Sequence, residues 1–182
     1  MKHVFLVTGN KNKLKEWQDM MPADISLGSI DLDLPEIQSI DPEEIVADKA
    51  RRAFEATGKP VVVEDVSAEL AKLNGLPGPF VKFFTKAMGD DALYTLAGRE
   101  DELATVSCTV AYYDGKRRLT VRGTVEGKVV SPRGNNGFGF DKTFVPNGET
   151  LTYAEMPTEQ KNTLSHRHHA ITLFLEAFGN LS

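Results

Sequence analysis

The chain has 182 residues, of which 41% are hydrophobic and 26% are charged, so it can bury a sizeable core in one domain over residues 1–182. Its formal net charge of -5 disfavours a nucleic-acid-binding surface, because such a surface needs clustered lysine and arginine. No segment approaches the roughly 18 apolar residues of a membrane helix, and the single cysteine and the lack of a signal-peptide pattern favour a cytoplasmic protein that does not contact membranes.

The first segment combines a short buried strand with a helix. Val4–Val7 is an apolar run that ends at Thr8-Gly9-Asn10, which is typical of a strand followed by a turn. Leu14, Trp17 and Met21 then recur at helical spacing. We therefore expect the turn at residues 8–10 to connect a strand to a helix.

A second helix is predicted to begin after Asp41. Asp41 can cap it, Pro42 suits its first turn, and Glu44 stands three residues after the cap, as in a capping box. Gly58 and Pro60 end the helical pattern, because glycine accommodates the turn after a helix and proline cannot continue one. A second apolar run begins directly after them.

The middle of the chain is richer in β-branched residues. Thr105–Tyr113 and Leu119–Val130 predict two strands, with Asp114-Gly115 in the turn between them. A glycine- and asparagine-rich loop follows at Gly134–Gly139, and the tail from Ser165 has the apolar periodicity of a helix. Strands alternating with helices, then a hairpin and a closing helix, predict an α/β fold with a mixed sheet flanked by helices.

The turn after the first strand has the features of a phosphate site. It comprises Thr8, Gly9, Asn10, Lys11, Asn12 and Lys13, and it lies where a strand meets the N-terminus of a helix. Such termini offer backbone N–H groups and a partial positive charge to anions. Lysines oppose that dipole, so the cluster of Lys11, Lys13 and Lys15 favours a bound polyphosphate, although solvated lysines are the alternative. The sequence GxxxxGK[ST] of a Walker loop is absent.

Acidic residues follow the second apolar run. Val61–Val63 leads into Glu64 and Asp65, whose side chains should point to opposite faces of the strand. A carboxylate at the end of a buried strand needs a cation or a donor to offset its desolvation. Mg²⁺ suits this position, since one or two carboxylates and substrate phosphates commonly hold it, and Glu36 could supply the second carboxylate. The alternative is that these acids are solvated loop residues.

A glycine-rich loop later in the chain carries two aromatic residues. Phe138 and Phe140 flank Gly139, and Asp141 follows them. Aromatic rings commonly stack on bases, so this loop is a candidate for purine recognition. Packing of both rings in the core is the competing interpretation.

Further hydrogen-bond donors come from Lys161 and the start of the last helix. Ser165 is a suitable N-cap, which would place His166 and Arg167 in an exposed first turn. The two histidines that follow show no metal-ligand spacing, so we expect them at the surface. Lys161 and Arg167 could both donate to a keto oxygen.

Taken in order, these segments resemble the inosine/xanthosine triphosphate pyrophosphatase family over essentially the whole chain. The matching motifs are TGNKNK (Thr8 to Lys13) with Glu16, DLPEIQ (Asp33 to Gln38), VVVED (Val61 to Asp65), GLPGPFVK (Gly75 to Lys82), the stretch from Ser131 to Asp141 that ends in FGFD, TYAEM (Thr152 to Met156) and EQKNTLSHR (Glu159 to Arg167). Single motifs among these are weak, whereas the ordered set is specific.

The resemblance implies an α/β fold with a long curved mixed sheet, and a nucleotide cleft between two lobes. It also implies a homodimer and a Mg²⁺-dependent enzyme. This enzyme would hydrolyse a purine nucleoside triphosphate between its α- and β-phosphates and release pyrophosphate. Deaminated nucleotides (ITP, dITP and XTP) are the expected substrates, and clearing them from the nucleotide pool is the expected role.

The resemblance also implies roles for individual residues. Thr8, Asn10, Lys13 and Lys49 would hold the triphosphate, Glu36 and Asp65 would coordinate Mg²⁺, and Asp65 would also be the general base. Phe138 and Phe140 would clamp the base, Asp141 and Lys161 would position it, and His166 with Arg167 would contact its 6-keto edge. Lys82 matches a further substrate contact of the family.

Three positions depart from the family pattern. Val66 stands where a serine or threonine is usual, Phe140 replaces a tryptophan or tyrosine, and Lys142-Thr143 follows Asp141 where a proline is usual. These changes motivate two alternatives. One is a related nucleotide pyrophosphatase that prefers a different base, and the other is a nucleotide-binding regulator without catalytic activity.

Overall fold

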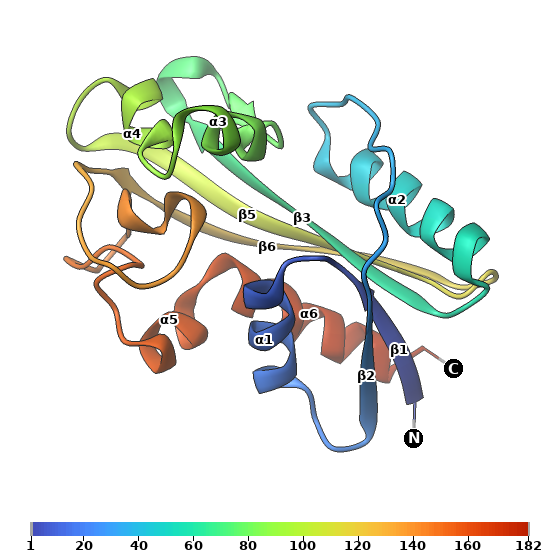
Figure 1. The fold of residues 1–182 in the computed structure, drawn as a ribbon. Helices are drawn as coiled ribbons and strands as arrows, with labels where there is room; N and C mark the ends of the chain where they lie inside the picture. The colour runs from blue at the N-terminus through green and yellow to red at the C-terminus, as the bar shows by residue number, and fades with distance from the viewer. Residues whose placement is uncertain (1, 182) are drawn as a thin grey trace. The chain divides into compact units, whose positions relative to one another are not determined.

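A seven-stranded mixed sheet with helices on its faces organises residues 2–181, which are the residues that the computed structural model describes (Figure 1). The strand order is β2-β1-β3-β5-β6-β7, and β4 pairs with β3. The strands are β1 (Lys2–Val7), β2 (Ile25–Ile30), β3 (Val61–Leu70), β4 (Pro77–Gly78), β5 (Glu102–Tyr113), β6 (Arg118–Val129) and β7 (Phe144–Pro146). The helices are α1 (Lys11–Met20), α2 (Pro42–Thr57), α3 (Val81–Met88), α4 (Ala92–Ala97), α5 (Thr158–Leu164) and α6 (His166–Gly179), with short 3₁₀ turns η1 (Ala71–Leu73) and η2 (Gly139–Lys142).

The pairing of the strands confirms the predicted mixed α/β architecture. β1 runs parallel to β2, with Lys2 opposite Ile25, and parallel to β3, with Phe5 opposite Val61. β4 is antiparallel to β3, and β7 is antiparallel to β6. The predicted cleft between two lobes stays a prediction, as does the assignment of residues 1–182 to one domain. Among residues 2–181 the helices are too short or too polar to span a bilayer.

The chain forms two compact units. Within the described residues, unit 1 comprises 2–65, 109–122 and 170–181, and unit 2 comprises 66–108 and 123–169. The strands β3, β5 and β6 contribute residues to both units, and so does α6. Each unit has its own buried cluster of apolar side chains, described below.

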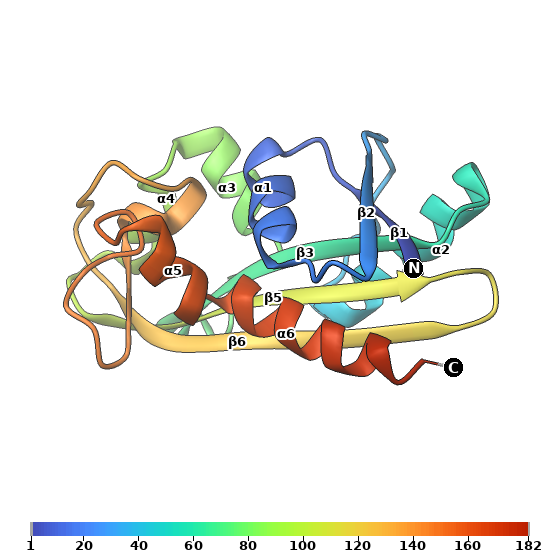
Figure 2. The same cartoon turned by 90° about the horizontal axis from the view of Figure 1, so that it is seen from below.

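In unit 1, helices cover both faces of the sheet. On one face Val46, Ala50 and Ala53 of α2 pack against Val61 and Val63 of β3. On the other face, α1 and α6 are joined by an edge-on contact between the rings of Trp17 and Phe174, whose centroids are 5.5 Å apart. Figures 1 and 2 show α2 on one side of the strands and α1 with α6 on the other. Odd-numbered residues of β3 in this unit therefore face α2, and even-numbered residues face α1.

Both ends of α2 follow the sequence prediction, with one exception. The Asp41 carboxylate accepts a hydrogen bond from the backbone N–H of Glu43 at 2.9 Å, and Gly58 ends the helix with φ of 64°. The predicted capping box is wrong, because the Glu44 carboxylate accepts instead from the Ser39 hydroxyl at 2.6 Å. The backbone N–H of Asp41 donates to the same Ser39 hydroxyl at 3.0 Å, so Ser39 takes over the reciprocal part of the cap.

The second buried strand is longer than predicted. β3 continues through Glu64 and Asp65 to Leu70, and eight of its ten residues are buried. The two acids therefore lie within the strand rather than at its carboxyl end, which corrects the sequence-based placement. The apolar run ends at Val63, but the strand continues, and side chains of α1 supply partners for the buried Glu64 carboxylate, as described below.

Unit 2 is built on the remaining lengths of β3, β5 and β6. Its core contains buried residues of β3, β5, β6, β7, α3 and α4 together with aromatic and methionine side chains from other parts of the segment after β6: Ala68, Leu70, Val81, Leu93, Ala97, Ala104, Val106, Val129, Phe140, Phe144, Tyr153 and Met156. Helices α3 and α4 and strand β4, which the sequence patterns did not predict, close one side of this core. They are short elements separated by glycine and proline, so they carry little periodicity.

Candidate functional site

The loop after β1 is organised by Asn10, which caps α1. The side-chain oxygen of Asn10 accepts hydrogen bonds from the backbone N–H groups of Asn12 at 2.9 Å and Lys13 at 3.2 Å. The backbone N–H of Asn10 donates to the Thr8 hydroxyl at 3.1 Å. A Cβ atom on Gly9 would lie 2.8 Å from an Asp31 carboxylate oxygen, so glycine permits this close approach. The first turn of α1 holds no acidic residue, so no side chain of that turn offsets the positive end of the helix dipole.

The three lysines of this segment have different surroundings. Lys11 is exposed, and Lys15 pairs with Asp19 one turn along the surface of α1 at 3.0 Å. Lys13 instead turns toward β3, where its ammonium lies 3.0 Å from a carboxylate oxygen of Glu64. Of the three, Lys13 is therefore the one held beside the strand that also carries Asp65.

A second ion pair joins the segment before α2 to the helix itself. The Lys49 ammonium donates to the Glu36 carboxylate at 2.7 Å, and both side chains are about four-fifths buried. The pKa of Lys49 is lowered, first by burial and next by the positive charge of Lys13, while the charges of Asp65 and Glu64 act in the opposite direction. Unit 1 thus gathers two lysines and three carboxylates in one electrostatic neighbourhood, which we call the charged cluster (Lys13, Glu36, Lys49, Glu64 and Asp65).

The two sides of β3 divide these carboxylates as the sequence predicted. Glu64 faces α1, since its two oxygens accept from Lys13 at 3.0 Å and from the Trp17 indole N–H at 2.8 Å. Asp65 has the parity of Val61 and Val63, which pack on α2, and its charge acts on Lys49 of that helix. Asp65 is only 4% exposed.

Glu36 and Asp65 have the chemistry to hold a magnesium ion. Both offer hard carboxylate oxygens, and Glu36 already accepts a cationic ammonium at 2.7 Å. Among residues 2–181, no three His, Cys, Asp or Glu side chains form a group that could hold a metal by themselves. A donor set of two carboxylates still fits Mg²⁺, which typically completes its shell with water and substrate phosphates.

In unit 2 the predicted base-recognition residues surround a buried ion pair. The Lys161 ammonium donates to the Asp141 carboxylate at 2.7 Å, and the two side chains are 7% and 5% exposed. The same carboxylate oxygen accepts from the backbone N–H of Phe138 at 2.8 Å. A Cβ atom on Gly137 would clash with this carboxylate, so the loop approaches Asp141 closely there. Gly139 begins the 3₁₀ turn that presents Asp141.

The two phenylalanines of this loop differ in exposure. The Phe138 ring is half-buried, and its centre lies 5.0 Å from the Lys161 ammonium and 5.5 Å from the Arg167 guanidinium carbon. Phe140 is 6% exposed and belongs to the core of unit 2, with its ring 6.4 Å from that of Phe144. Of the pair, Phe138 has the more accessible ring face.

His166 and Arg167 are not in an exposed helical turn, which corrects the sequence-based prediction. Ser165 does cap α6, since its hydroxyl accepts from the backbone N–H of His168 at 3.1 Å. His166 and Arg167 are nevertheless each only 3% exposed. Aromatic rings from earlier segments cover them: the rings of Phe140 and Tyr153 lie 5.7 and 5.9 Å from the His166 ring, and Phe138 lies against Arg167.

Lys82 lies on α3, apart in sequence from the other predicted contacts. It is exposed, and its ammonium lies 5.1 Å from the centre of the neighbouring Phe83 ring. This cation–π contact supports the side chain at the helix surface. A substrate contact for Lys82 stays a prediction.

Sequence reasoning assigned Trp17 only to the apolar spacing of a helix, and it gave neither Trp17 nor Tyr153 a role in the site. Trp17 is fully buried and donates to Glu64, and Tyr153 lies within 5.8 Å of Lys161 and beside His166. A signal for Trp17 was present, because it stands four residues after Lys13 and therefore on the same face of α1. Tyr153 comes from an irregular segment, where periodicity gives no direction to a side chain.

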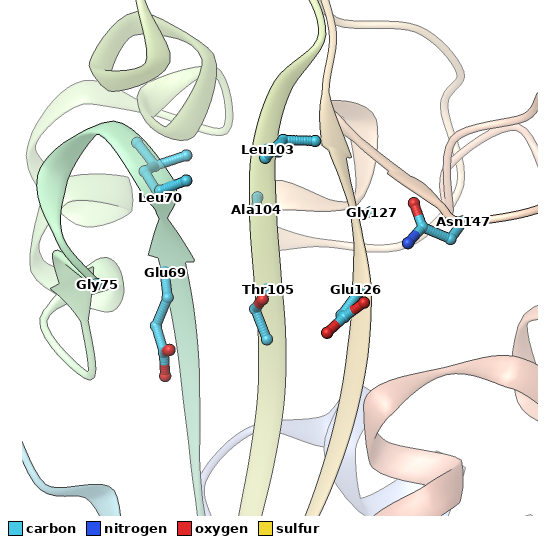
Figure 3. A pocket seen from close by; sticks show the side chains of 10 residues that line it. Glu69, Leu70, Gly75, Leu103, Ala104, Thr105, Glu126, Gly127 and Asn147 are labelled. Carbon is cyan, nitrogen blue, oxygen red and sulfur yellow. The ribbon is translucent and has the colours of Figure 1, made fainter.

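The structure also contains a cavity that no predicted site residue lines. It has a volume of about 410 Å³ and lies in unit 2, over the ends of β3, β5 and β6 (Figure 3). Glu69, Thr105 and Glu126 project from these three neighbouring strands, with Leu103 and Asn147 nearby. Its lining residues include two carboxylates and no lysine or arginine, so this cavity is unsuitable for a polyphosphate. The predicted site residues therefore form two groups, each within one unit: the charged cluster in unit 1 and the Asp141–Lys161 group in unit 2.

Comparison with known proteins gives consistent matches over nearly the whole chain. A sequence model of the Ham1 family matches residues 4–177. The chain is 45% identical over 172 residues to the inosine triphosphate pyrophosphatase of Yarrowia lipolytica, covering 92% of this chain and 91% of that protein.

Two solved structures share the fold. The Ham1 protein of Staphylococcus aureus superposes with a TM-score of 0.84 at 27% identity and covers 100% of both chains. A protein from Mycobacterium abscessus named as a nucleoside-triphosphatase or dITP/XTP pyrophosphatase gives a TM-score of 0.72 at 29% identity, covering 95% of this chain and 98% of that one.

Proposed function

The chain belongs to the Ham1 family, and we propose that it hydrolyses deaminated purine nucleoside triphosphates to the monophosphate and pyrophosphate. ITP, dITP and XTP are the proposed substrates, and removing them from the nucleotide pool is the proposed role. The observation that carries the proposal is the charged cluster, in which Lys13 and Lys49 lie among carboxylates that include Asp65.

The triphosphate is assigned to unit 1. Its proposed contacts are the loop and helix start with the buried lysine of α2: Thr8, Gly9, Asn10, Lys11, Asn12, Lys13 and Lys49. Asn10 already caps two backbone N–H groups of α1, so most of the attraction for phosphate comes from the lysines and the helix dipole. Lys13 and Lys49 would neutralise charge on the phosphoryl oxygens as the reaction proceeds.

Glu36 and Asp65 are the proposed ligands of Mg²⁺. When bound, the ion would neutralise phosphate charge and orient the triphosphate. Lys49 pairs with Glu36 at 2.7 Å. If Glu36 bound the ion, the Lys49 ammonium would be available to contact the phosphates instead.

Asp65 is the proposed general base. It would accept a proton from the attacking water as the water oxygen bonds to phosphorus and the bridging P–O bond breaks, with the electron pair leaving on pyrophosphate. The charge of Asp65 acts on the Lys49 ammonium, so the carboxylate lies near one of the proposed phosphate contacts. The aliphatic neighbour Val66 offers no hydroxyl, so the base acts without the adjacent hydroxyl that is usual in the family.

The base is assigned to unit 2. Phe138 offers an accessible ring for stacking, while Phe140 supports His166 from the core. Arg167, His166 and Lys161 can donate hydrogen bonds, and a 6-keto group accepts them. Adenine carries a 6-amino donor instead, and a buried donor facing another donor is costly, so ATP should be a poor substrate.

A different base preference with the same chemistry is the second candidate. It is favoured by Phe140, whose ring is buried and lacks the polar group of the tryptophan or tyrosine that is usual in the family. A non-catalytic regulator is disfavoured, because Asp65, Glu36 and both lysines are retained. A homodimer and a cytoplasmic location are part of the same proposal, the first implied by the family resemblance and the second by the single cysteine.

The proposed function predicts a distinct substrate profile. Pyrophosphate release should be strong with ITP and XTP, weak with ATP and dUTP, and lost when Mg²⁺ is chelated. The measurement is pyrophosphate release from ITP, XTP, GTP, ATP and dUTP, each with and without Mg²⁺. Release centred on another nucleotide would support the second candidate, and binding without release from any nucleotide would overturn the enzyme assignment.

Lys13→Ala is predicted to weaken triphosphate binding. We expect KM for ITP to rise by about ten- to a hundredfold, because a charged hydrogen bond to phosphate is lost, with a smaller change in kcat. Lys15→Ala is the matched control, since Lys15 lies on the same helix but pairs with Asp19 at the surface. Thermal unfolding should accompany the kinetics, because Glu64 also loses a partner. An unchanged KM would contradict the phosphate assignment.

A further inference from the structure

We infer that Glu64 is a positioning residue that holds the Lys13 ammonium in place for the triphosphate. The inference rests on the proposed function and extends it to a residue that neither binds the substrate nor serves as the proposed base. Glu64 faces α1, away from the side of β3 that carries Asp65.

The geometry of the Glu64 carboxylate divides its two oxygens between two donors. One oxygen accepts from the Trp17 indole N–H at 2.8 Å, and the other lies 3.0 Å from the Lys13 ammonium. Trp17 is fully buried and packs edge-on against Phe174 of α6. The buried indole therefore holds one oxygen of the Glu64 carboxylate, and the other oxygen holds the Lys13 ammonium.

Lys13 is suited to bridge the interior and a bound anion. An ammonium has three N–H donors, and the contact with Glu64 uses one of them. The Lys13 side chain is 21% exposed while that of Glu64 is 1% exposed, so Lys13 reaches solvent while its partner stays buried. A free lysine loses much rotamer freedom when it binds phosphate, and anchoring it beforehand removes part of that cost.

A purely structural role explains the arrangement less well. A carboxylate within a buried strand is expensive to desolvate, and an apolar residue of similar volume commonly serves stability as well or better. The charge of Glu64 also disfavours an approaching triphosphate. The position of Glu64 is therefore explained if the benefit of holding Lys13 in place exceeds the repulsion between Glu64 and the triphosphate.

Two variants separate positioning from charge. In Glu64→Gln the single amide oxygen should stay with the buried indole, which would turn the NH₂ group toward Lys13 and displace it. Trp17→Phe keeps the carboxylate charge but removes its anchor. If Glu64 positions Lys13, KM for ITP should rise about tenfold in Glu64→Gln and about threefold in Trp17→Phe, with kcat changed less than about threefold in both. If only its charge matters, Glu64→Gln should lower KM and Trp17→Phe should leave it unchanged.

A double-mutant cycle supplies the readout that a structural role would not move. In a Lys13→Ala background, Glu64→Gln should change KM by less than about twofold, because the residue that it positions is absent. An equal change in both backgrounds, or a lowered KM in Glu64→Gln, would overturn the inference. Melting temperatures of all variants identify any loss that comes from unfolding.

Binding of inorganic pyrophosphate, measured by calorimetry, distinguishes this inference from the proposed function. If the unmodified protein binds pyrophosphate but releases no pyrophosphate from any nucleotide, the proposed function fails. The same double-mutant cycle then still tests the role of Glu64, with the dissociation constant of pyrophosphate as the readout. A weaker affinity in Glu64→Gln that vanishes in the Lys13→Ala background supports the inference. Binding of equal strength in Glu64→Gln and the unmodified protein overturns it.

Discussion

Replacing Asp65 by asparagine is expected to lower kcat for pyrophosphate release from ITP by about a thousandfold or more, while the protein stays folded. Asparagine has the same shape, but it cannot accept a proton from water and it binds a divalent cation poorly. Both proposed roles of Asp65 are lost together, so the effect should exceed that of removing a general base alone. The side chain is only 4% exposed, so a change of shape here would be harder to interpret than a change of charge.

The measurement is pyrophosphate release at saturating ITP and Mg²⁺, together with thermal unfolding of the same samples. Glu69→Gln is the control, since Glu69 lies on the same strand but in unit 2 and lines the cavity of Figure 3. It should keep kcat within about twofold of the unmodified protein. Near-normal turnover by Asp65→Asn would contradict the assignment of both the base and the metal ligand.

Local signals in the sequence were sufficient for the parts of the site that are built from neighbouring residues. Asp41 and Ser165 were predicted to cap helices, and they do so by contacts that span at most three residues, so residue type and spacing determine them. The Asn10 cap is equally local, although it was not predicted. The alternation of Glu64 and Asp65 was equally predictable, because it follows from the geometry of any strand.

Contacts between distant segments account for what the sequence did not show. The burial of His166 and Arg167 is produced by Phe138, Phe140 and Tyr153, which are 13 to 29 residues away in the chain. The extension of β3 beyond Val63 depends on a similar long-range effect. Two consecutive acids after an apolar run predict the end of a strand. Trp17 and Lys13 from α1 supply partners to the Glu64 carboxylate, so the strand can bury this residue.

The same dependence on distant partners makes the Asp141–Lys161 pair the most sensitive structural element of the base-recognition group. Both side chains are more than nine-tenths buried, and the ammonium lies 2.7 Å from the carboxylate. Lys161→Met keeps the length of the side chain but leaves the Asp141 charge without its ammonium. We expect the free energy of unfolding to fall by about 3 kcal/mol, because breaking a buried pair from one side exposes the full desolvation cost of the other charge.

Denaturant unfolding at neutral pH measures this loss, and two further variants define its cause. Adding Asp141→Asn to Lys161→Met should recover part of the stability, since the amide oxygen can still accept from the backbone N–H of Phe138. Lys142→Met is the matched control. It breaks a neighbouring lysine–aspartate pair that is exposed and 4.0 Å long, so it should cost less than about 0.5 kcal/mol. If Lys161→Met cost no more than Lys142→Met, the pair would not hold the loop that presents Phe138, and base recognition would have to depend on Arg167 and the aromatic contacts alone.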